Sequence, residues 1–338
     1  MQSYYNNKVY INRRQCESCG NALKPLKIRD EFYRRPFLKN EHAVETQLSM
    51  LFNAVAICHQ TRLFANPEHN LYGWDYLEWG FLNLANASSW LLQPAKLLTY
   101  SVNDIAQALT SAFSPNNDGI NSTLDTATER AALMHALAGF VLEKYGGSFA
   151  TLLASAQHQT GGVNGIYTTL NQTVAFEDPR KKKTSFLVKL LHDAGLFIIS
   201  DPQHYVPIMD YHMQRVLLRT GCVEIKDPDL FRMLANQEPQ DTDEPVRSAC
   251  IDALTIIADI SGHPVWVMND FLWPLGRSCC NTHPLCVSGR CEKEPCTFAL
   301  LAALPGNHKK CIFQEFCIGS HDDNYRNLYE PIIKTHYY

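Results

Sequence analysis

Two residues near the middle of the chain have the types and the placement of a nucleophile and a supporting carboxylate. Lys183 follows two further lysines and opens the amphipathic segment 183–198. The positive end of a helix and neighbouring like charges both favour a neutral amine, which is a nucleophile. Asp210 follows an extended Val-Pro-Ile-Met segment and precedes an amphipathic run, so we expect it to be a helix N-cap that stays ionised.

An antiparallel pair of helices opened by Lys183 and Asp210 would direct the amine and the carboxylate into one cleft. That arrangement is an activated nucleophile with a charge-stabilising partner. The alternative interpretation is a basic surface run followed by an ordinary N-cap.

Cysteines are the second group of residues that could do chemistry. The chain has 12 cysteines, and seven of them lie between Cys279 and Cys317. Two pairs have regular spacing, Cys279-x6-Cys286 and Cys311-x5-Cys317. Four thiolates of one chain bind either tetrahedral zinc or a four-iron cluster, so we expect a metal centre in this region.

Other cysteines provide alternative ligand sets. Cys280, Cys291 and Cys296 lie in the same cluster and offer different combinations of four. Cys16-x2-Cys19 is half of a zinc knuckle, and Cys291 and Cys296 could complete a second zinc site if the N-terminus folds back.

Lys183 is followed by Thr184, and around Asp210 the chain has Pro207, His212 and Arg215, with Arg219-x-Gly221 after them. This pattern resembles the helix-hairpin-helix DNA glycosylases. The signature of that superfamily is a Lys-Thr helix start, then a Pro-x-x-Asp-x-His-x-x-Arg segment that ends in Arg-x-Gly. The matching positions here are Lys183, Thr184, Pro207, Asp210, His212, Arg215, Arg219 and Gly221. The most similar subfamily is the archaeal-type 8-oxoguanine DNA glycosylases, in which a long connection without a Gly-rich hairpin also separates the two segments.

This resemblance implies a fold, an activity and a cofactor. The fold is a two-lobed all-α glycosylase fold with a small cysteine-rich metal region at its C-terminal end. Lys183 would be the Schiff-base nucleophile, and Asp210 the catalytic carboxylate. Endonuclease III and MutY-like glycosylases carry a [4Fe-4S] cluster on Cys-x6-Cys-x2-Cys-x5-Cys. The ligands implied here, with a long insertion, are Cys279, Cys286, Cys311 and Cys317.

The chain departs from the superfamily at the phosphate-binding hairpin. The Leu-Pro-Gly-Val-Gly sequence is replaced by Phe-Glu-Asp-Pro-Arg at 176–180, so DNA anchoring would depend on side chains. The candidate DNA-binding side chains are Arg180, Lys181, Lys182, His212 and Arg215. A flipped base needs aromatic faces and polar partners, and the candidates are Trp74, Asn269, Asp270 and Trp273. A core position is the alternative for each tryptophan.

Helical periodicity dominates the chain, and we expect an all-α fold. Apolar stripes at helical spacing occupy 44–56, 183–198 and 249–260. Further helices are expected at 73–92, 103–113, 125–144, 147–156, 211–220 and 264–275. We expect an N-terminal extension with short strands at 1–40, a helical glycosylase domain at 41–276, and a cysteine-rich cluster region with a tail at 277–338.

Charge and hydropathy restrict the partners. The net charge is −4, so DNA binding must depend on local basic patches rather than on a global field. No apolar run approaches the roughly 18–20 residues of a membrane span, and the first residues lack the layout of a signal peptide. We expect an intracellular monomer, cytoplasmic or nucleoid-associated, without a membrane partner.

The predicted function is a DNA N-glycosylase with AP lyase activity that excises an 8-oxoguanine-like damaged or modified purine from double-stranded DNA. One alternative is a nucleotide N-glycosidase that resembles the queuosine-salvage proteins, which share an Asp-Tyr segment. Another is a nucleic-acid binding protein without catalysis, in which the metal is structural.

Overall fold

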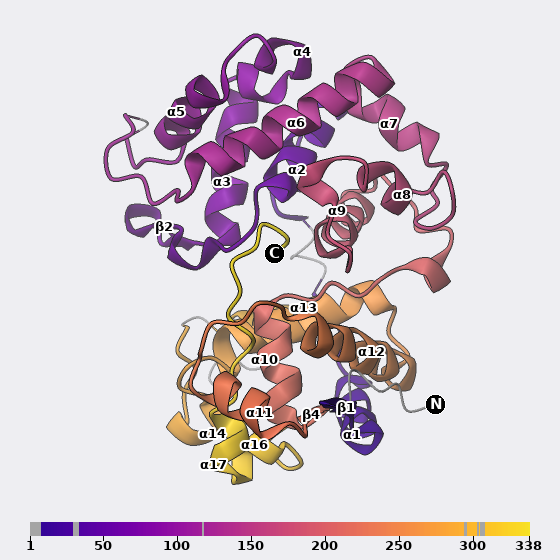
Figure 1. Ribbon diagram of the computed structural model, residues 1–338, viewed down its shortest axis with the longest axis vertical. Coiled ribbons are helices and arrows are strands. Elements are labelled where there is room, and N and C mark those ends of the chain that lie inside the picture. The colour runs from indigo at the N-terminus through magenta and orange to yellow at the C-terminus, as the bar shows by residue number, and fades with distance from the viewer. Residues whose placement is uncertain (1–7, 30–33, 117, 294–295, 303, 305–307) are drawn as a thin grey trace. The chain divides into compact units, whose positions relative to one another are not determined.

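The structure is a computed structural model that describes residues 8–29, 34–116, 118–293, 296–302, 304 and 308–338. The chain divides into two compact units. Unit 1 comprises Met1–Phe32 and Tyr205–Lys334, and unit 2 comprises Tyr33–His204 and Thr335–Tyr338. Most described residues are helical, which is compatible with the expected all-α class (Figure 1).

Strands are few and short. In unit 1, β1 (Val9–Ile11) pairs antiparallel with β4 (Val223–Ile225), with Tyr10 opposite Glu224. In unit 2, β2 (Ala65–Asn66) pairs antiparallel with β3 (Leu71–Tyr72). The β1–β4 pair ties the N-terminal segment to the chain that follows the Asp210 region.

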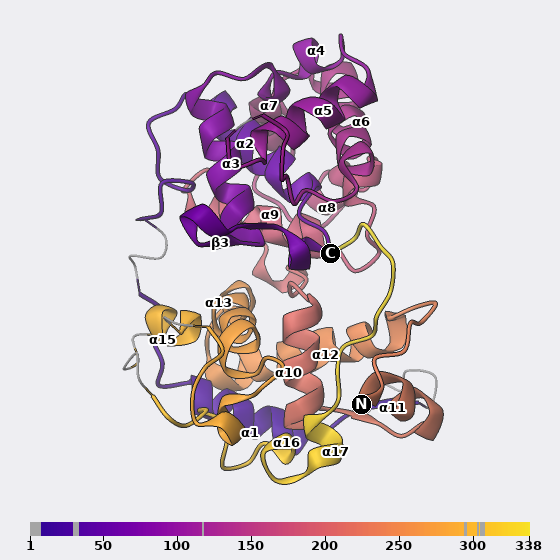
Figure 2. The same cartoon turned by 90° about the vertical axis from the view of Figure 1, so that its left-hand side faces the viewer.

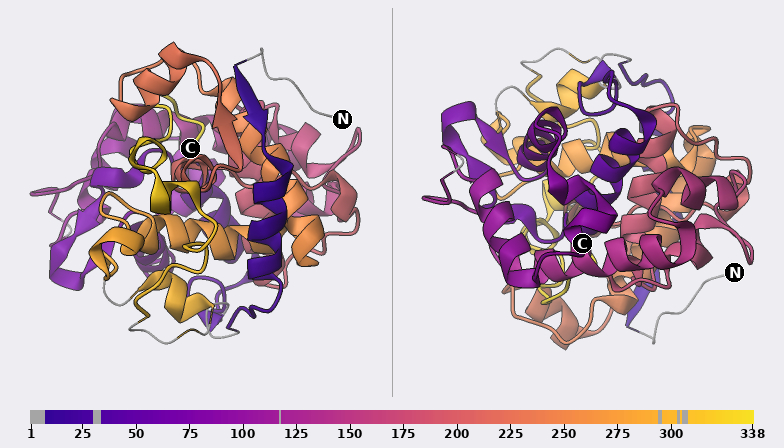
Figure 3. Two further views of the ribbon diagram at one scale, coloured as in Figure 1. Left: turned by 90° about the horizontal axis from the view of Figure 1, so that it is seen from below. Right: turned by 90° about the horizontal axis from the view of Figure 1, so that it is seen from above.

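Unit 1 is built around α12 and α10. Its helices are α1 (Arg13–Leu23), α10 (Tyr211–Thr220), α11 (Pro228–Ala235), α12 (Glu244–Ser261), η7 (Val265–Val267), α13 (Met268–Pro274), η8 (Leu275–Cys279), α14 (Leu285–Ser288), α15 (Thr297–Leu301), α16 (Ile318–His321) and α17 (Asp323–Arg326). Helix α1 packs along α12, which is easiest to follow in the view from below (Figure 3). Helix α10 contacts α12 and α13 on one side and α16 and α17 on another (Figure 2).

The core of unit 1 explains these contacts. Met213, Val216 and Leu217 on α10 are fully buried, as are Ala253, Leu254 and Ile257 on α12. Helices α1 and α12 approach each other closely at Gly20, where a Cβ atom would lie 2.6 Å from the Cβ of Ile260. Only glycine permits that distance.

Unit 2 surrounds the apolar helix α2. Its helices are α2 (Val44–Ala56), η2 (Thr61–Leu63), η3 (Pro67–His69), α3 (Trp74–Asn86), η4 (Trp90–Leu92), α4 (Pro94–Leu97), α5 (Val102–Ala112), α6 (Ala127–Tyr145), α7 (Phe149–Ser155), α8 (Ile166–Leu170), η5 (Val174–Phe176), α9 (Lys182–Asp193) and η6 (Pro202–His204). Every residue of α2 from Leu48 to Ala56 is buried, and α3, α6, α7 and α9 all contact it.

The predicted helix at 44–56 is confirmed, and the one at 183–198 ends early. Helix α9 stops at Asp193, and the chain turns at Gly195, whose φ of +78° suits glycine rather than other residues. No single helix of the described residues is long and apolar enough to cross a membrane. The consecutive segments Glu244–Ser261 and Val265–Cys279 together have the length and composition, but they are bent by 110° and their apolar side chains belong to the core of unit 1.

Candidate functional site

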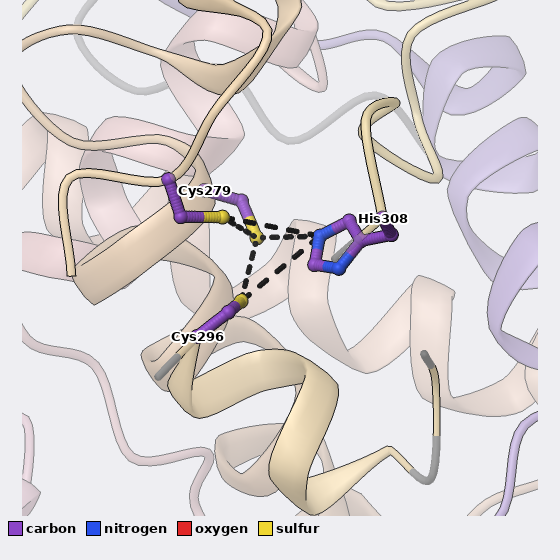
Figure 4. A group of neighbouring side chains, drawn as sticks. Cys279, Cys296 and His308 are labelled. Atoms are coloured by element: carbon purple, nitrogen blue, oxygen red, sulfur yellow. Dashed lines mark hydrogen bonds between the residues drawn. The ribbon is translucent and has the colours of Figure 1, made fainter. Parts of the chain in front are cut away.

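A group of three cysteines and one histidine in unit 1 could hold a metal ion. Cys279, Cys291, Cys296 and His308 each offer one ligand atom, and these four atoms lie within 4.8 Å of one another. The Sγ atom of Cys279 is 3.5 Å from Sγ of Cys296, 3.6 Å from Sγ of Cys291 and 3.4 Å from Nε2 of His308. Figure 4 shows Cys279, Cys296 and His308 converging. Three sulfurs and an imidazole nitrogen suit a tetrahedral metal.

Short helices position this Cys3His group. Cys279 ends η8, which continues the line of α13 through Pro274, and Cys296 is the N-cap of α15. The Ala299 N–H donates to Sγ of Cys296 at 3.4 Å, and Oγ of Ser278 lies 3.5 Å from the same sulfur. The hydrogen bond with Cys279, together with those of Ser278 and Ala299, lowers the pKa of Cys296 below its ordinary value, against the opposing effect of burial. A thiolate, the form that binds metals, is therefore favoured at Cys296.

The predicted cluster ligands lie around a neighbouring cavity of unit 1. Cys279, Cys286, Cys311 and Cys317 all line it, and so does Cys280. Apolar side chains, among them Val216, Leu275 and Phe313, form part of its wall. Burial raises the pKa of Cys286, Cys311 and Cys317, and the adjacent Cys280 raises each of them as well. The two predicted cysteine pairs are therefore brought together, although they are 25 or more residues apart in sequence.

The alternative zinc set of Cys16, Cys19, Cys291 and Cys296 is wrong. Cys16 and Cys19 are buried where α1 packs on α12, and they contact Cys222 instead. Sγ of Cys19 is 3.5 Å from Sγ of Cys222, and Sγ of Cys16 donates to the Cys222 carbonyl oxygen at 3.9 Å. Cys291 and Cys296 belong to the Cys3His group. The helical conformation of 13–23, which we did not predict from the sequence, buries both N-terminal thiols in the core.

Lys183 lies in unit 2, fully buried, on the first turn of α9. Its Nζ donates a hydrogen bond to the carbonyl oxygen of Ala56 at 2.5 Å. Burial lowers the pKa of Lys183 to about 7, and the positive charges of Lys182 and Arg130 act in the same direction, against the attraction of Cys58 and Asp178. An appreciable fraction of the amine is therefore neutral at physiological pH.

Other polar residues surround Lys183, and the sequence did not single out three of them, Cys58, His59 and Arg130. Nζ of Lys182 is 3.4 Å from Sγ of Cys58, and Arg130 donates to the carbonyl oxygen of His59 at 3.0 Å. The His59 ring is buried, and neither of its nitrogens has a hydrogen-bond partner among the described residues. Burial and the charge of Lys183 lower the pKa of His59 far below its usual value, so the ring is neutral. The Cys58-His59 pair directly after a predicted apolar helix was the available sequence signal.

The C-terminal residues also belong to this part of unit 2. The N–H of Gln60 donates to the carbonyl oxygen of Tyr338 at 3.1 Å, and His336 lies 3.4 Å from the carboxylate of Glu177. The α9 N-terminus is capped from Asp178, whose carboxylate accepts the N–H of Lys182 at 2.8 Å and that of Arg180 at 2.9 Å. These contacts fix the position from which Lys183 enters the core.

Asp210 is the N-cap of α10 in unit 1, as predicted. Its Oδ1 accepts the N–H of Met213 at 3.0 Å, and the side chain is nearly buried. Lys183 and Asp210 thus lie at the starts of α9 and α10, which belong to different units.

The candidate DNA-binding residues are exposed to different degrees. Arg180 and Lys181 are partly exposed, with Nζ of Lys181 2.5 Å from Oδ1 of Asn171, whereas Lys182 is buried. Arg215 is buried, with NH1 2.9 Å from Glu330 and NH2 3.0 Å from the ring of His212. Burial acts to lower the pKa of Arg215, but the combined effects of the Glu330 carboxylate, Cys280 and Tyr211 are larger and raise it.

The candidate base-pocket residues are divided between the units. Trp74, on α3 of unit 2, donates to Oε1 of Glu78 at 2.6 Å and packs edge-on against Phe186. The other three lie on α13 of unit 1: Asn269 and Trp273 are partly exposed and Asp270 is buried. The guanidinium of Arg277 lies over the Trp273 ring, 4.9 Å from its centre.

The chain matches no protein-family model, and the comparison with curated proteins gives no significant match.

Proposed function

We propose that this chain is a DNA N-glycosylase with AP lyase activity, of the helix-hairpin-helix type, and that Lys183 is its nucleophile. The observation that carries the proposal is the buried Lys183 amine, whose pKa is lowered to about 7 at the start of α9. A lysine needs a lowered pKa to attack carbon at neutral pH, and burial is the common means of lowering it.

The proposed reaction begins when the neutral Nζ leaves the Ala56 carbonyl oxygen and attacks C1′ of the damaged nucleotide. The C1′–N bond breaks, and the base leaves with the bonding electron pair and takes up a proton. The covalent sugar adduct opens to an imine with Lys183. Loss of the C2′ proton then expels the 3′ phosphate by β-elimination, and water releases the amine.

Asp210 stabilises the positive charge that develops on the sugar as the base departs. Its carboxylate accepts a backbone N–H at the start of α10, an arrangement that keeps a carboxyl group ionised. A fixed negative charge beside a developing cation is the type of electrostatic contribution that lowers such barriers most.

The proposed substrate is double-stranded DNA with a damaged or modified purine. Arg180 and Lys181 are partly exposed cations beside the α9 N-terminus, suited to phosphate contacts. The partly exposed Trp273 and Asn269 offer an aromatic face and an amide on one helix, suited to a flipped base, and Asp270 and Trp74 are further candidates for that pocket. A structural [4Fe-4S] cluster in the cysteine-rich region of unit 1 completes the proposal.

Product analysis on matched substrates tests this function. The full chain is incubated with duplex oligonucleotides that carry 8-oxoguanine or other modified purines, with the undamaged duplex, and with the corresponding free nucleotides. We expect base release and strand cleavage on a damaged duplex only. Base release from free nucleotides alone would instead support the nucleotide N-glycosidase, and binding without release on every substrate would support a non-catalytic binding protein.

A further inference from the structure

The seven C-terminal cysteines lie in two adjacent groups that share a boundary at the Cys279-Cys280 pair. We propose that they hold two separate metal centres: one ion on Cys279, Cys291, Cys296 and His308, and an iron–sulfur cluster on Cys280, Cys286, Cys311 and Cys317. This inference does not rest on the proposed glycosylase activity. It assigns the cluster ligand to Cys280 in place of Cys279.

Cys279 belongs to the Cys3His group. Its Sγ lies 3.4–3.6 Å from the ligand atoms of Cys291, Cys296 and His308. Sulfurs at that separation match a tetrahedral zinc site, in which Zn–S bonds of about 2.3 Å place the sulfurs roughly 3.8 Å apart. A thiolate that binds this ion is not free to be a terminal ligand of the neighbouring centre as well.

A cavity lies next to the Cys3His group, and Cys279 lines it too. Cys280, Cys286, Cys311 and Cys317 line this cavity, so four thiols remain there when Cys279 is assigned elsewhere. The ligand atoms that lie within 4.8 Å of one another are those of the separate Cys3His group. In an iron–sulfur cluster each of four thiolates binds a different iron atom, so four cysteines around one cavity suit such a cluster.

A positive charge lies beside Cys280. Arg219 is buried, and its guanidinium donates to the carbonyl oxygens of Leu328 and Asn281 and lies 3.9 Å from Sγ of Cys280. No carboxylate of the described residues pairs with Arg219, whereas its neighbour Arg215 pairs with Glu330. A buried cation requires a compensating negative charge. A four-thiolate centre that includes Cys280 is anionic and provides it.

The backbone around the cavity supports the same assignment. The Nε of Arg215 donates to the carbonyl oxygen of Cys280 at 3.1 Å. Arg215 therefore holds the backbone of one of the four proposed ligands. Such outer contacts commonly orient metal ligands.

The experiment measures the metal content and the visible spectrum of the full chain, purified without air, for the wild type and for matched serine variants. We expect about four iron atoms and one zinc per chain, with the broad absorbance of a cluster. Cys280→Ser and Cys311→Ser should lose the iron and the colour and keep the zinc. Cys291→Ser and His308→Gln should lose the zinc and keep the colour.

The adjacent pair Cys279→Ser and Cys280→Ser is the sharpest comparison. Loss of colour with Cys279→Ser, together with full colour and iron in Cys280→Ser, would overturn the assignment of ligands. The wild-type metal content is decisive even if variants fail to fold, because protein with zinc alone, with iron alone or with neither would contradict two centres of different kinds.

Discussion

The side chain of Lys183 closes the end of another helix: its Nζ donates to the carbonyl oxygen of Ala56, the last residue of α2, at 2.5 Å. Arg130 donates hydrogen bonds to the carbonyl oxygens of Ile57 and His59, which follow Ala56 in the chain. The hydrogen bond to a helix C-terminus favours the protonated amine, while complete burial favours the neutral one. Burial dominates, and the pKa of Lys183 falls to about 7.

Stability should depend on pH through Lys183. The pKa is about 7 in the folded chain and 10.5, the ordinary value, in the unfolded chain. Between these values the unfolded chain holds a proton that the folded chain lacks, so the free energy of unfolding rises with pH, by up to about 1.4 kcal/mol per pH unit. Denaturant unfolding of the wild type and Lys183→Met from pH 6.5 to 9.5 measures the difference. If the free energy of unfolding rose equally with pH in the two proteins, the pKa of Lys183 would not be lowered in the folded chain.

The rate of base excision should depend on the protonation state of Lys183. The neutral amine is the nucleophile, so the single-turnover rate should rise about tenfold per pH unit below pH 7 and level off above it. A rapid-quench series on a damaged duplex between pH 5.5 and 9 gives the profile. A rate that is still rising at pH 9 would indicate that the nucleophile has the pKa of an ordinary lysine.

Asp210 has a structural and a proposed chemical role, and two substitutions separate them. Asp210→Asn preserves an N-cap oxygen for the Met213 N–H and removes the charge. It should leave the free energy of unfolding nearly unchanged and slow excision on the order of 10²–10³-fold. Asp210→Ala should in addition cost about 1 kcal/mol of stability. Equal excision rates for Asp210→Asn and the wild type would remove Asp210 from the mechanism.

Substitution of Arg215 should lower the stability of the fold rather than remove a contact with DNA. Its guanidinium is buried against Glu330, with 2.9 Å between NH1 and the carboxylate. Removing one partner leaves a buried charge, so Arg215→Met should destabilise the fold by about 3–5 kcal/mol. Lys181→Gln is the contrasting variant: it should weaken DNA binding and reduce its salt dependence while the unfolding transition stays in place. Chemical denaturation and binding titrations at several salt concentrations check both.

The sequence predicted local structure better than it predicted ligand sets. The apolar spacing of 44–56 and the N-cap at Asp210 correspond to α2 and α10, because both depend on residues close in the chain. Helix α1 was missed, since its polar composition hides a buried face of Cys16, Cys19 and Leu23 that only α12 explains. The partners of Cys279 were missed for a related reason: His308 is 29 residues away, and no spacing rule links them.

The central claim is that Lys183 is the nucleophile, and borohydride trapping tests it most directly. The full chain and three variants, Lys183→Gln, Lys182→Gln and Lys189→Gln, are incubated with lesion-bearing duplex and borohydride, and the adduct is mapped by mass spectrometry of its peptides. Lys182 and Lys189 are buried lysines of the same helix, and Lys189 is paired with Asp193 at 2.7 Å, so both are matched controls. We predict an adduct on the peptide that contains Lys183, present in both controls and absent in Lys183→Gln while that variant still binds DNA. An adduct that survives Lys183→Gln, or one that maps to another lysine, would contradict the claim.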